Sequence, residues 1–338
     1  MGPVVLLETT APAQSLVWQD DSLVDLVGGR AWSAAGVEHR TVTGYGPVFD
    51  RSVVSSSGRY SVVYAERGTR ALLVRGSRVV RELTRSIYHA DDFDYPVALG
   101  VLPDGREILV HCPEEYNVLH IEEAESGKRL TSGPRGDKDV FHSRLSVSQD
   151  GRHLLVAGWV WHPYGIAEVF DLQAALTDPA ALDGPGVLPM EPGIDAEVES
   201  ACWLGRDRLV VATGEEFLDD EEVPALGPRE LGVWSLSERR WMHRSQVDFK
   251  VGTLLAGGGG GSRVVSLHGH PRLIDITTGA VLAEWPEVDV ARREGAYGVT
   301  HVPTPVAALH PDGTRLAVAQ TGSIAVIQLP DPDDGQAP

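Results

Sequence analysis

The sequence predicts an all-β protein, a single propeller of seven four-stranded antiparallel blades. Short apolar runs alternate with turn residues along nearly the whole 338-residue chain. A strand–turn–strand phrase also recurs, and its successive turns lie roughly 37 to 55 residues apart, which is the spacing of propeller blades. Because a lone four-stranded sheet is marginal in water, we expect these units to pack on one another.

The clearest copy of the phrase spans residues 145–156. It reads as a strand, a turn at Gln149-Asp150-Gly151 and a second strand. The Asp-Gly pair supplies the positive φ that a hairpin turn needs. Similar turns follow the first strands of other units, at Ser57-Gly58, Asp104-Gly105, Gly205-Arg206 and Asp312-Gly313.

These turns divide the chain into seven units, near residues 13–43, 48–84, 95–132, 141–190, 198–246, 251–285 and 306–329. The fourth unit contains a possible short helix at 173–176, and the last unit lacks a fourth strand. Val4-Val5-Leu6-Leu7 is the candidate that completes it, which would close the ring and remove a free sheet edge. The alternative is six blades, with the first unit as an appendage. We expect the propeller to span residues 1–330 and a polar tail to span 331–338.

Composition narrows the function classes. A formal charge of −19 disfavours binding to nucleic acid or to an anionic membrane, since both need a basic surface. That charge suits a solvated surface, a basic protein partner or a cationic ligand. Two cysteines make neither a disulfide framework nor a zinc site. The first eight residues lack a signal-peptide pattern, and no apolar run is long enough to span a membrane, so we expect a cytoplasmic protein. Arginine outnumbers lysine, which is typical of a GC-rich genome, and we expect a bacterial source.

Several third strands end in a similar way, at Val169-Phe170-Asp171-Leu172, Val233-Trp234-Ser235-Leu236 and Leu273-Ile274-Asp275-Ile276. With the Asp-Gly turns, this pattern resembles the WD40 superfamily of β-propellers in degenerate form, since no Trp-Asp pair ends these strands. The resemblance covers nearly the whole chain. It implies a rigid toroid that usually binds proteins, although enzymatic propellers also exist.

In such a blade, the loop between the second and third strands emerges on the same face as the links between blades. One link on this face, residues 89–96, carries His89, Asp91, Asp92 and Asp94 close to the predicted channel. These side chains could bind a divalent cation or a guanidinium group. The alternative is a solvated acidic loop whose carboxylates cap turns.

The inner loop of the fourth unit gives the strongest binding signal. It carries Trp159, Trp161, His162 and Tyr164, and exposed aromatic side chains are the residues that anchor interfaces. The alternative is that this loop folds onto its own blade. The next inner loop, residues 214–224, is acidic, with Glu215 and Glu216 at its start. It could dock a basic partner or remain a solvated loop.

Histidines supply the remaining candidates. His268 and His270 are two residues apart, so on one strand they would share a face and could ligate a metal. His142, Tyr297 and His301 also fall on or beside the loop face, where a histidine beside a carboxylate suits acid–base chemistry.

No nucleophile elbow, zinc-protease motif or phosphate loop is present in the sequence. The leading hypothesis is therefore a non-catalytic scaffold that binds a partner protein, with a basic segment, through its acidic and aromatic loop face. It requires no cofactor. The alternative is an enzyme, or a protein that binds a small ligand or a divalent metal, with its site at the channel mouth.

Overall fold

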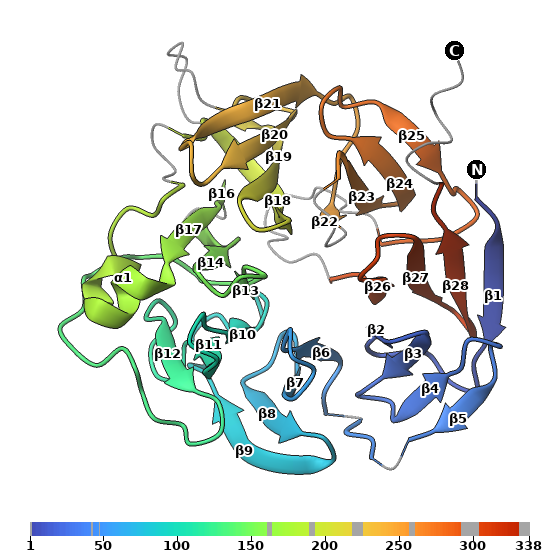
Figure 1. Cartoon of the computed structure of the whole chain (residues 1–338), viewed down its shortest axis with the longest axis horizontal. Helices are drawn as coiled ribbons and strands as arrows, with labels where there is room; N and C mark the ends of the chain where they lie inside the picture. The colour runs from blue at the N-terminus through green and yellow to red at the C-terminus, as the bar shows by residue number, and fades with distance from the viewer. Residues whose placement is uncertain are drawn as a thin grey trace.

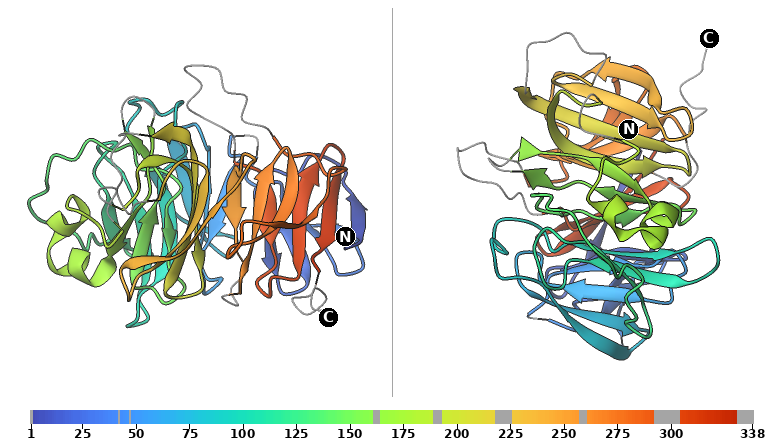
Figure 2. Two further views of the ribbon diagram at one scale, coloured as in Figure 1. Left: turned by 90° about the horizontal axis from the view of Figure 1, so that it is seen from above. Right: turned by 90° about the vertical axis from the view of Figure 1, so that its left-hand side faces the viewer.

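A computed structural model describes residues 2–41, 43–46, 48–160, 164–188, 193–217, 226–256, 261–291 and 304–330. The strands form seven antiparallel blades around a central axis, which confirms the predicted fold and makes the six-blade alternative wrong (Figure 1). Seen from the side, the ring is a thick disc with one short helix, α1 (Leu172–Thr177), at its rim (Figure 2).

Four described blades are built from four consecutive strands, ordered from the channel outward. They are β2 (Val17–Gln19), β3 (Ser22–Asp25), β4 (Arg30–Trp32) and β5 (Glu38–Arg40) in blade one; β6 (Arg51–Val54), β7 (Ser61–Tyr64), β8 (Arg70–Arg75) and β9 (Arg78–Thr84) in blade two; β18 (Ala196–Leu204), β19 (Arg208–Phe217), β20 (Glu230–Ser235) and β21 (Arg240–Gln246) in blade five; and β22 (Thr253–Leu255), β23 (Arg263–His268), β24 (His270–Asp275) and β25 (Val281–Glu284) in blade six.

Blades three and four have three regular strands each. They are β10 (Val97–Val101), β11 (Glu107–His111) and β12 (His120–Glu123), and β13 (Ser146–Val147), β14 (His153–Val156) and β17 (Glu168–Asp171). The outermost position is held by single bridges, Glu122 to Arg129 and Val169 to Leu188. In blade three, a side chain replaces part of the ladder, because Ile121 N donates to Thr131 Oγ1 at 2.9 Å.

Two further elements belong to blade four. A small hairpin, β15 (Trp159–Val160) and β16 (Tyr164–Gly165), extends its inner loop. The predicted helix appears as α1, followed by a 3-10 turn, η1 (Pro179–Leu182). Asp171 begins α1 as its N-cap, since its carboxylate accepts a hydrogen bond from Ala174 N. Because α1 and η1 follow β17 directly, no regular fourth strand does.

The first and last parts of the chain share blade seven. Strand β1 (Val4–Glu8) pairs with β28 (Ser323–Gln328), which continues to β27 (Arg315–Gln320) and β26 (Ala307–Leu309). The register runs unbroken from Val4 opposite Ile327 to Glu8 opposite Ser323. The predicted ring closure is therefore confirmed, as the blue and red strands of Figure 1 show.

Apolar cores fill the spaces between neighbouring blades. Because side chains alternate along each strand, one face of a blade packs on the preceding blade and the other on the following blade. Ile108 and Val110 of blade three, for example, pack with Leu154 and Val156 of blade four. The innermost strands lie very close: a Cβ on Gly100 would lie 2.6 Å from Val147 Cγ1.

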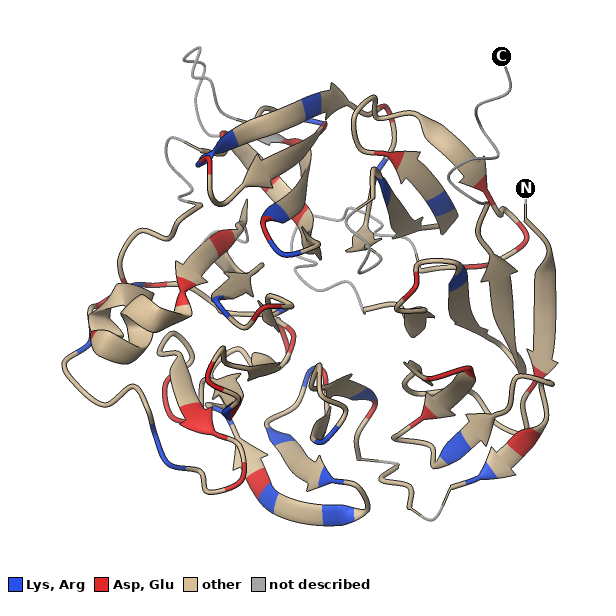
Figure 3. Cartoon of the chain, in the orientation of Figure 1, with Lys and Arg blue, Asp and Glu red and all other residues tan. Residues whose placement is uncertain are grey.

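The recurring turn phrase also has its predicted backbone. Its glycines adopt positive φ at Gly58, Gly105, Gly151, Gly205 and Gly313. Charged residues of both signs are distributed around the ring, and the outermost strands β5, β9 and β21 carry Lys or Arg (Figure 3). Within the described ranges, no helix is long and apolar enough to cross a membrane.

Candidate functional site

The link between blades two and three is held by one buried arginine. Arg85 follows β9, and its guanidinium donates to the carbonyl oxygens of Gly68 at 2.7 Å, Asp94 at 3.1 Å and Phe93 at 3.0 Å. It also lies over the rings of Phe93 and Tyr95, 4.6 and 5.1 Å from their centroids. Burial lowers the pKa of Arg85 to about 10, so the group is charged at neutral pH. This cation therefore fixes the path of the link.

The four predicted residues of this link point in different directions. His89 Nδ1 lies 2.6 Å from Asp92 Oδ2 at the surface. Asp94 is buried and accepts from Arg144 Nε of blade four at 2.9 Å. Asp91 is exposed. In the described part of the chain, no three His, Cys, Asp or Glu residues are placed to hold a metal ion. A divalent cation at this link stays a prediction.

Five aromatic rings converge beside this link, between blades three and four. We call Tyr88, Phe93, Tyr116, Phe141 and Trp159 the aromatic platform. The ring centroids lie 3.9 Å apart for Phe141 and Trp159, 4.7 Å for Tyr116 and Phe141, and 4.9 Å for Tyr88 and Tyr116. Phe93 meets Phe141 edge-on at 5.4 Å. Two links and two inner loops thus share one aromatic cluster.

The platform is buried at one end and exposed at the other. Trp159 is only 7% exposed, whereas Tyr88 is 51% exposed and the adjacent Ile87 is 85% exposed. Trp159 is therefore buried against Phe141 of the preceding link. Tyr164 is half-buried in β16, while Trp161 and His162 lie outside the described residues.

Sequence reasoning missed Tyr88 at the exposed end of the platform and Phe141 at its buried end. Tyr88 precedes the acidic link that was singled out, and Phe141 lies in the next link. Neither residue belongs to a local aromatic run, so only their placement on neighbouring links of the same face could have suggested the cluster.

Carboxylates border the platform. Tyr116 Oη donates to Asp139 Oδ1 at 2.6 Å, and this bond, with burial and the negative charge of Asp137, raises the pKa of Tyr116 to about 12. The lysine between the two aspartates turns away: Lys138 Nζ lies 2.7 Å from both carboxylate oxygens of Glu168. We call Asp137 and Asp139, both exposed, the acidic rim.

His142 lies beneath this face. It is buried, and its Nε2 lies 3.1 Å from the carbonyl oxygen of Asn117. Burial lowers its pKa to about 3, despite the bond to Asn117. The imidazole is therefore neutral at pH 7 and holds the loop of blade three against the following link.

His268 and His270 do not share a strand. They form the facing pair that ends β23 and begins β24, with Gly269 at φ +72° between them, so the one-strand geometry assumed from the sequence is wrong. His270 Nε2 lies 3.1 Å from Glu284 Oε2. The tight turn needs a left-handed residue, which glycine supplies.

For the remaining candidate residues the structure describes few contacts. Glu215 is exposed and pairs with Arg229, whose Nη2 lies 2.7 Å from its carboxylate. Glu216 lies in β19, and nothing is described of its side chain. Tyr297 and His301 lie outside the described residues.

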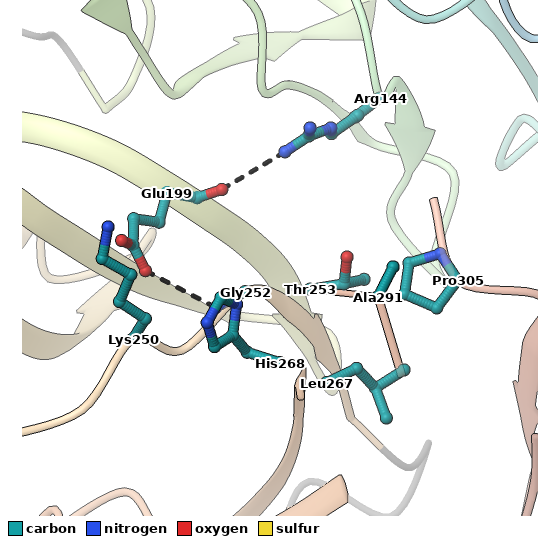
Figure 4. Close-up of a pocket in the computed structure, with 9 residues that line it drawn as sticks. All are labelled: Arg144, Glu199, Lys250, Gly252, Thr253, Leu267, His268, Ala291 and Pro305. Carbon is teal, nitrogen blue, oxygen red and sulfur yellow. Dashed lines mark hydrogen bonds between the residues drawn. The ribbon is translucent and has the colours of Figure 1, made fainter. Parts of the chain in front are cut away.

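A small pocket lies where the innermost parts of blades four to seven meet (Figure 4). Arg144 Nη1 donates to the carbonyl oxygen of Glu199 at 3.2 Å, and Glu199 Oε2 accepts from Val251 N at 3.1 Å. Lys250 and His268 complete its polar lining. The cavity measures about 30 Å³, roughly enough for two water molecules. A ligand or metal site at the channel mouth stays a prediction.

Comparisons with known proteins find no matching family model and no matching curated protein. Solved structures do match. One, titled "Crystal Structure of Mitotic Checkpoint Complex", is 12% identical with a TM-score of 0.60, and the match covers 97% of this chain and 95% of that one. Another, "Structure of U3-55K", is 11% identical with a TM-score of 0.60, covering 96% and 98%. These likenesses, together with the seven described blades, give the chain the fold of a seven-bladed β-propeller.

Proposed function

We propose that this chain is a non-catalytic interaction scaffold of the cytoplasm that binds a partner protein over the aromatic platform. The observation that carries the proposal is the exposure of Ile87 and Tyr88 above a packed aromatic floor. Exposed apolar groups that sit on a rigid support are typical of binding surfaces, because little conformational entropy is lost when a partner covers them.

The rigidity of the floor supports this function. Arg85 donates hydrogen bonds to the carbonyl oxygens of Gly68 and of Phe93, which lies in the same link as Tyr88. Phe141 and Trp159 exchange backbone hydrogen bonds at 2.9 and 3.2 Å. The platform is therefore preorganised. Tyrosine is also one of the residue types most often found among the few that dominate binding energy.

The charge around the platform indicates the chemistry of the partner. Asp137 and Asp139 are exposed, and the neighbouring Lys138 is engaged with Glu168. A partner segment with an arginine or lysine beside an apolar side chain fits this surface, because the cation meets the acidic rim and the face of Tyr88. One matched structure is titled as a mitotic checkpoint complex, which agrees with a scaffold role.

The experiment is an affinity pull-down from native extract with wild-type protein and an Ile87→Ser/Tyr88→Ala double variant. A matched control carries Val79→Ser, which removes an exposed apolar side chain from β9. A stoichiometric partner that is kept by the control and lost by the double variant supports the proposal. A partner that binds all three proteins equally would overturn the assignment to the platform.

A further inference from the structure

We propose that the outer edge of β1 accepts an extended segment of a partner protein as a fifth strand of blade seven. This site is separate from the aromatic platform. It combines outward-facing backbone groups, a regular edge that carries no charge before Glu8, and an apolar groove beside that edge.

The backbone pattern shows which groups of β1 are free. Pro3 O accepts from Gln328 N at 3.0 Å, and Thr9 N donates to Gly322 O at 3.1 Å. In an antiparallel ladder, residues that bond to the neighbouring strand alternate with residues whose N–H and C=O point away from it. Val4 and Leu6 therefore direct these groups outward, to the side on which β1 has no neighbour among the described strands of its sheet.

The edge of β1 also lacks the usual protection against strand addition. Charged side chains and bulges commonly protect such edges. The outermost strands β5, β9 and β21 carry Lys or Arg, whereas β1 has no charged residue before Glu8 (Figure 3). Strand β25 is also apolar, but its pairing with β24 is irregular between Leu273 and Ile274. Strand β1 carries no charge from Val4 to Leu7 and has an unbroken register.

A groove lies on one side of this edge, between blades seven and one. It measures about 260 Å³, and apolar side chains form most of its lining, namely Val5, Leu7, Trp18, Trp32 and Val326. An apolar cavity of about 150 Å³ can already hold benzene. Both indole N–H groups are directed to backbone oxygens, those of Ala308 and Glu8, so the rings offer apolar surface to the groove.

The two faces of β1 suit the alternating side chains of an added strand. Val5 is 56% exposed on the groove side, and Leu6, which points to the opposite face, is 63% exposed. One set of side chains of the incoming strand would enter the groove, and the other set would cover Leu6. Main-chain bonds then supply affinity and the groove supplies specificity.

The charge at both ends of the site selects the occupant. Glu8 is exposed at one end of β1, and Asp20 is exposed beside Asp21, which lines the groove and pairs with Arg315 at 2.6 Å. We therefore assign the site to an apolar β-forming segment flanked by lysine or arginine. The chain's own residues 331–338 do not have this chemistry, because they contain three aspartates and two prolines.

The test uses a synthetic probe, the heptapeptide Lys-Val-Thr-Val-Thr-Val-Lys with blocked ends and a fluorescent label. Saturable binding in fluorescence anisotropy is expected for wild-type protein. Leu6→Pro removes an N–H that points outward, so the fold should survive while affinity falls about tenfold or more. Tyr88→Ala should bind like wild type, which separates this site from the platform.

Two methylated probes provide a test that needs no protein variant. Each carries N-methyl groups on alternate amides, in complementary sets, and only the probe whose bonding amides remain free should bind. No saturable binding by wild type, equal binding of both methylated probes, or full binding by folded Leu6→Pro would overturn the proposal. A concentration-dependent dimer that Leu6→Pro abolishes would assign the edge to a second copy of the chain and would also overturn it.

Discussion

The indole of Trp159 lies flat on the ring of Phe141, with 3.9 Å between the centroids and 8° between the planes. The same two residues exchange backbone hydrogen bonds. This pair joins the inner loop of blade four to the link that precedes the blade. It forms the buried end of the platform, and Tyr88 forms the exposed end.

The two ends of the platform should respond differently to substitution. Phe141→Ala removes a buried ring and should lower the free energy of unfolding by about 3–5 kcal/mol. Tyr88→Ala should cost below about 1 kcal/mol, because half of its surface is already in water. Urea denaturation checks both values. Equal losses in the two variants would contradict the division into a buried floor and an exposed end.

Arg85 should be a structural requirement for the platform. Arg85→Met leaves several buried carbonyl oxygens without a donor, so we expect a loss of about 3 kcal/mol or more in unfolding free energy. Arg85→Lys should recover only part of it, because an ammonium group cannot reproduce the planar set of donors. Thermal and urea unfolding measure the effect. A change of under about 0.5 kcal/mol in Arg85→Met would show that the link holds itself in place.

Ring closure should depend on the N-terminal strand. Deletion of residues 1–8 uncovers β28 and removes Val4 and Leu7 from apolar clusters with neighbouring blades. We expect the melting temperature to fall clearly and a hydrophobic dye to bind to the uncovered surface. A peptide of residues 2–9 added in excess should restore part of the melting temperature. An unchanged melting curve after the deletion would contradict closure through β1.

His142 should make stability depend on pH. Its folded pKa, about 3, lies below the usual value of 6.5 because burial disfavours the charged imidazole. The unfolded chain therefore binds a proton that the folded chain does not, so this contribution is intact above pH 6.5 and is lost as pH falls toward 3. The slope is ~1.4 kcal/mol per pH unit in that window.

The control for this dependence is His142→Gln, which keeps a donor for the Asn117 carbonyl and cannot titrate. Urea midpoints at pH 7 and pH 5 should converge for the two proteins as the pH falls, since only wild type loses the histidine contribution. A difference between the two urea midpoints that stays the same at pH 7 and pH 5 would show that His142 titrates alike in the folded and unfolded chains.

Local patterns in the sequence predicted most of the fold. Asp150-Gly151 determines a turn by backbone conformation alone, and residues 173–176 form a helix behind an Asp cap. The pairing of β1 with β28 could be predicted because the last unit lacks a fourth strand and an unpaired edge in that blade would be unfavourable.

The site was less predictable, because it depends on contacts between distant residues. Tyr88, Tyr116 and Phe141 are far apart in the chain and meet only when neighbouring blades pack. The sequence suggested Trp159 as an aromatic of the loop face, but nothing local indicates that Phe141 covers it. The shared face considered for His268 and His270 would require both on one strand, whereas Gly269 makes a turn between two strands.

A photo-crosslinking experiment addresses the proposed function at the platform itself. A benzophenone amino acid replaces Tyr88 in one protein and Val79 in another, and both are irradiated in native extract. We expect one dominant crosslinked protein at position 88, mapped to a peptide with basic and apolar residues, and none of it at position 79. Crosslinking of the same protein at both positions, or only at position 79, would contradict a partner site on the aromatic platform.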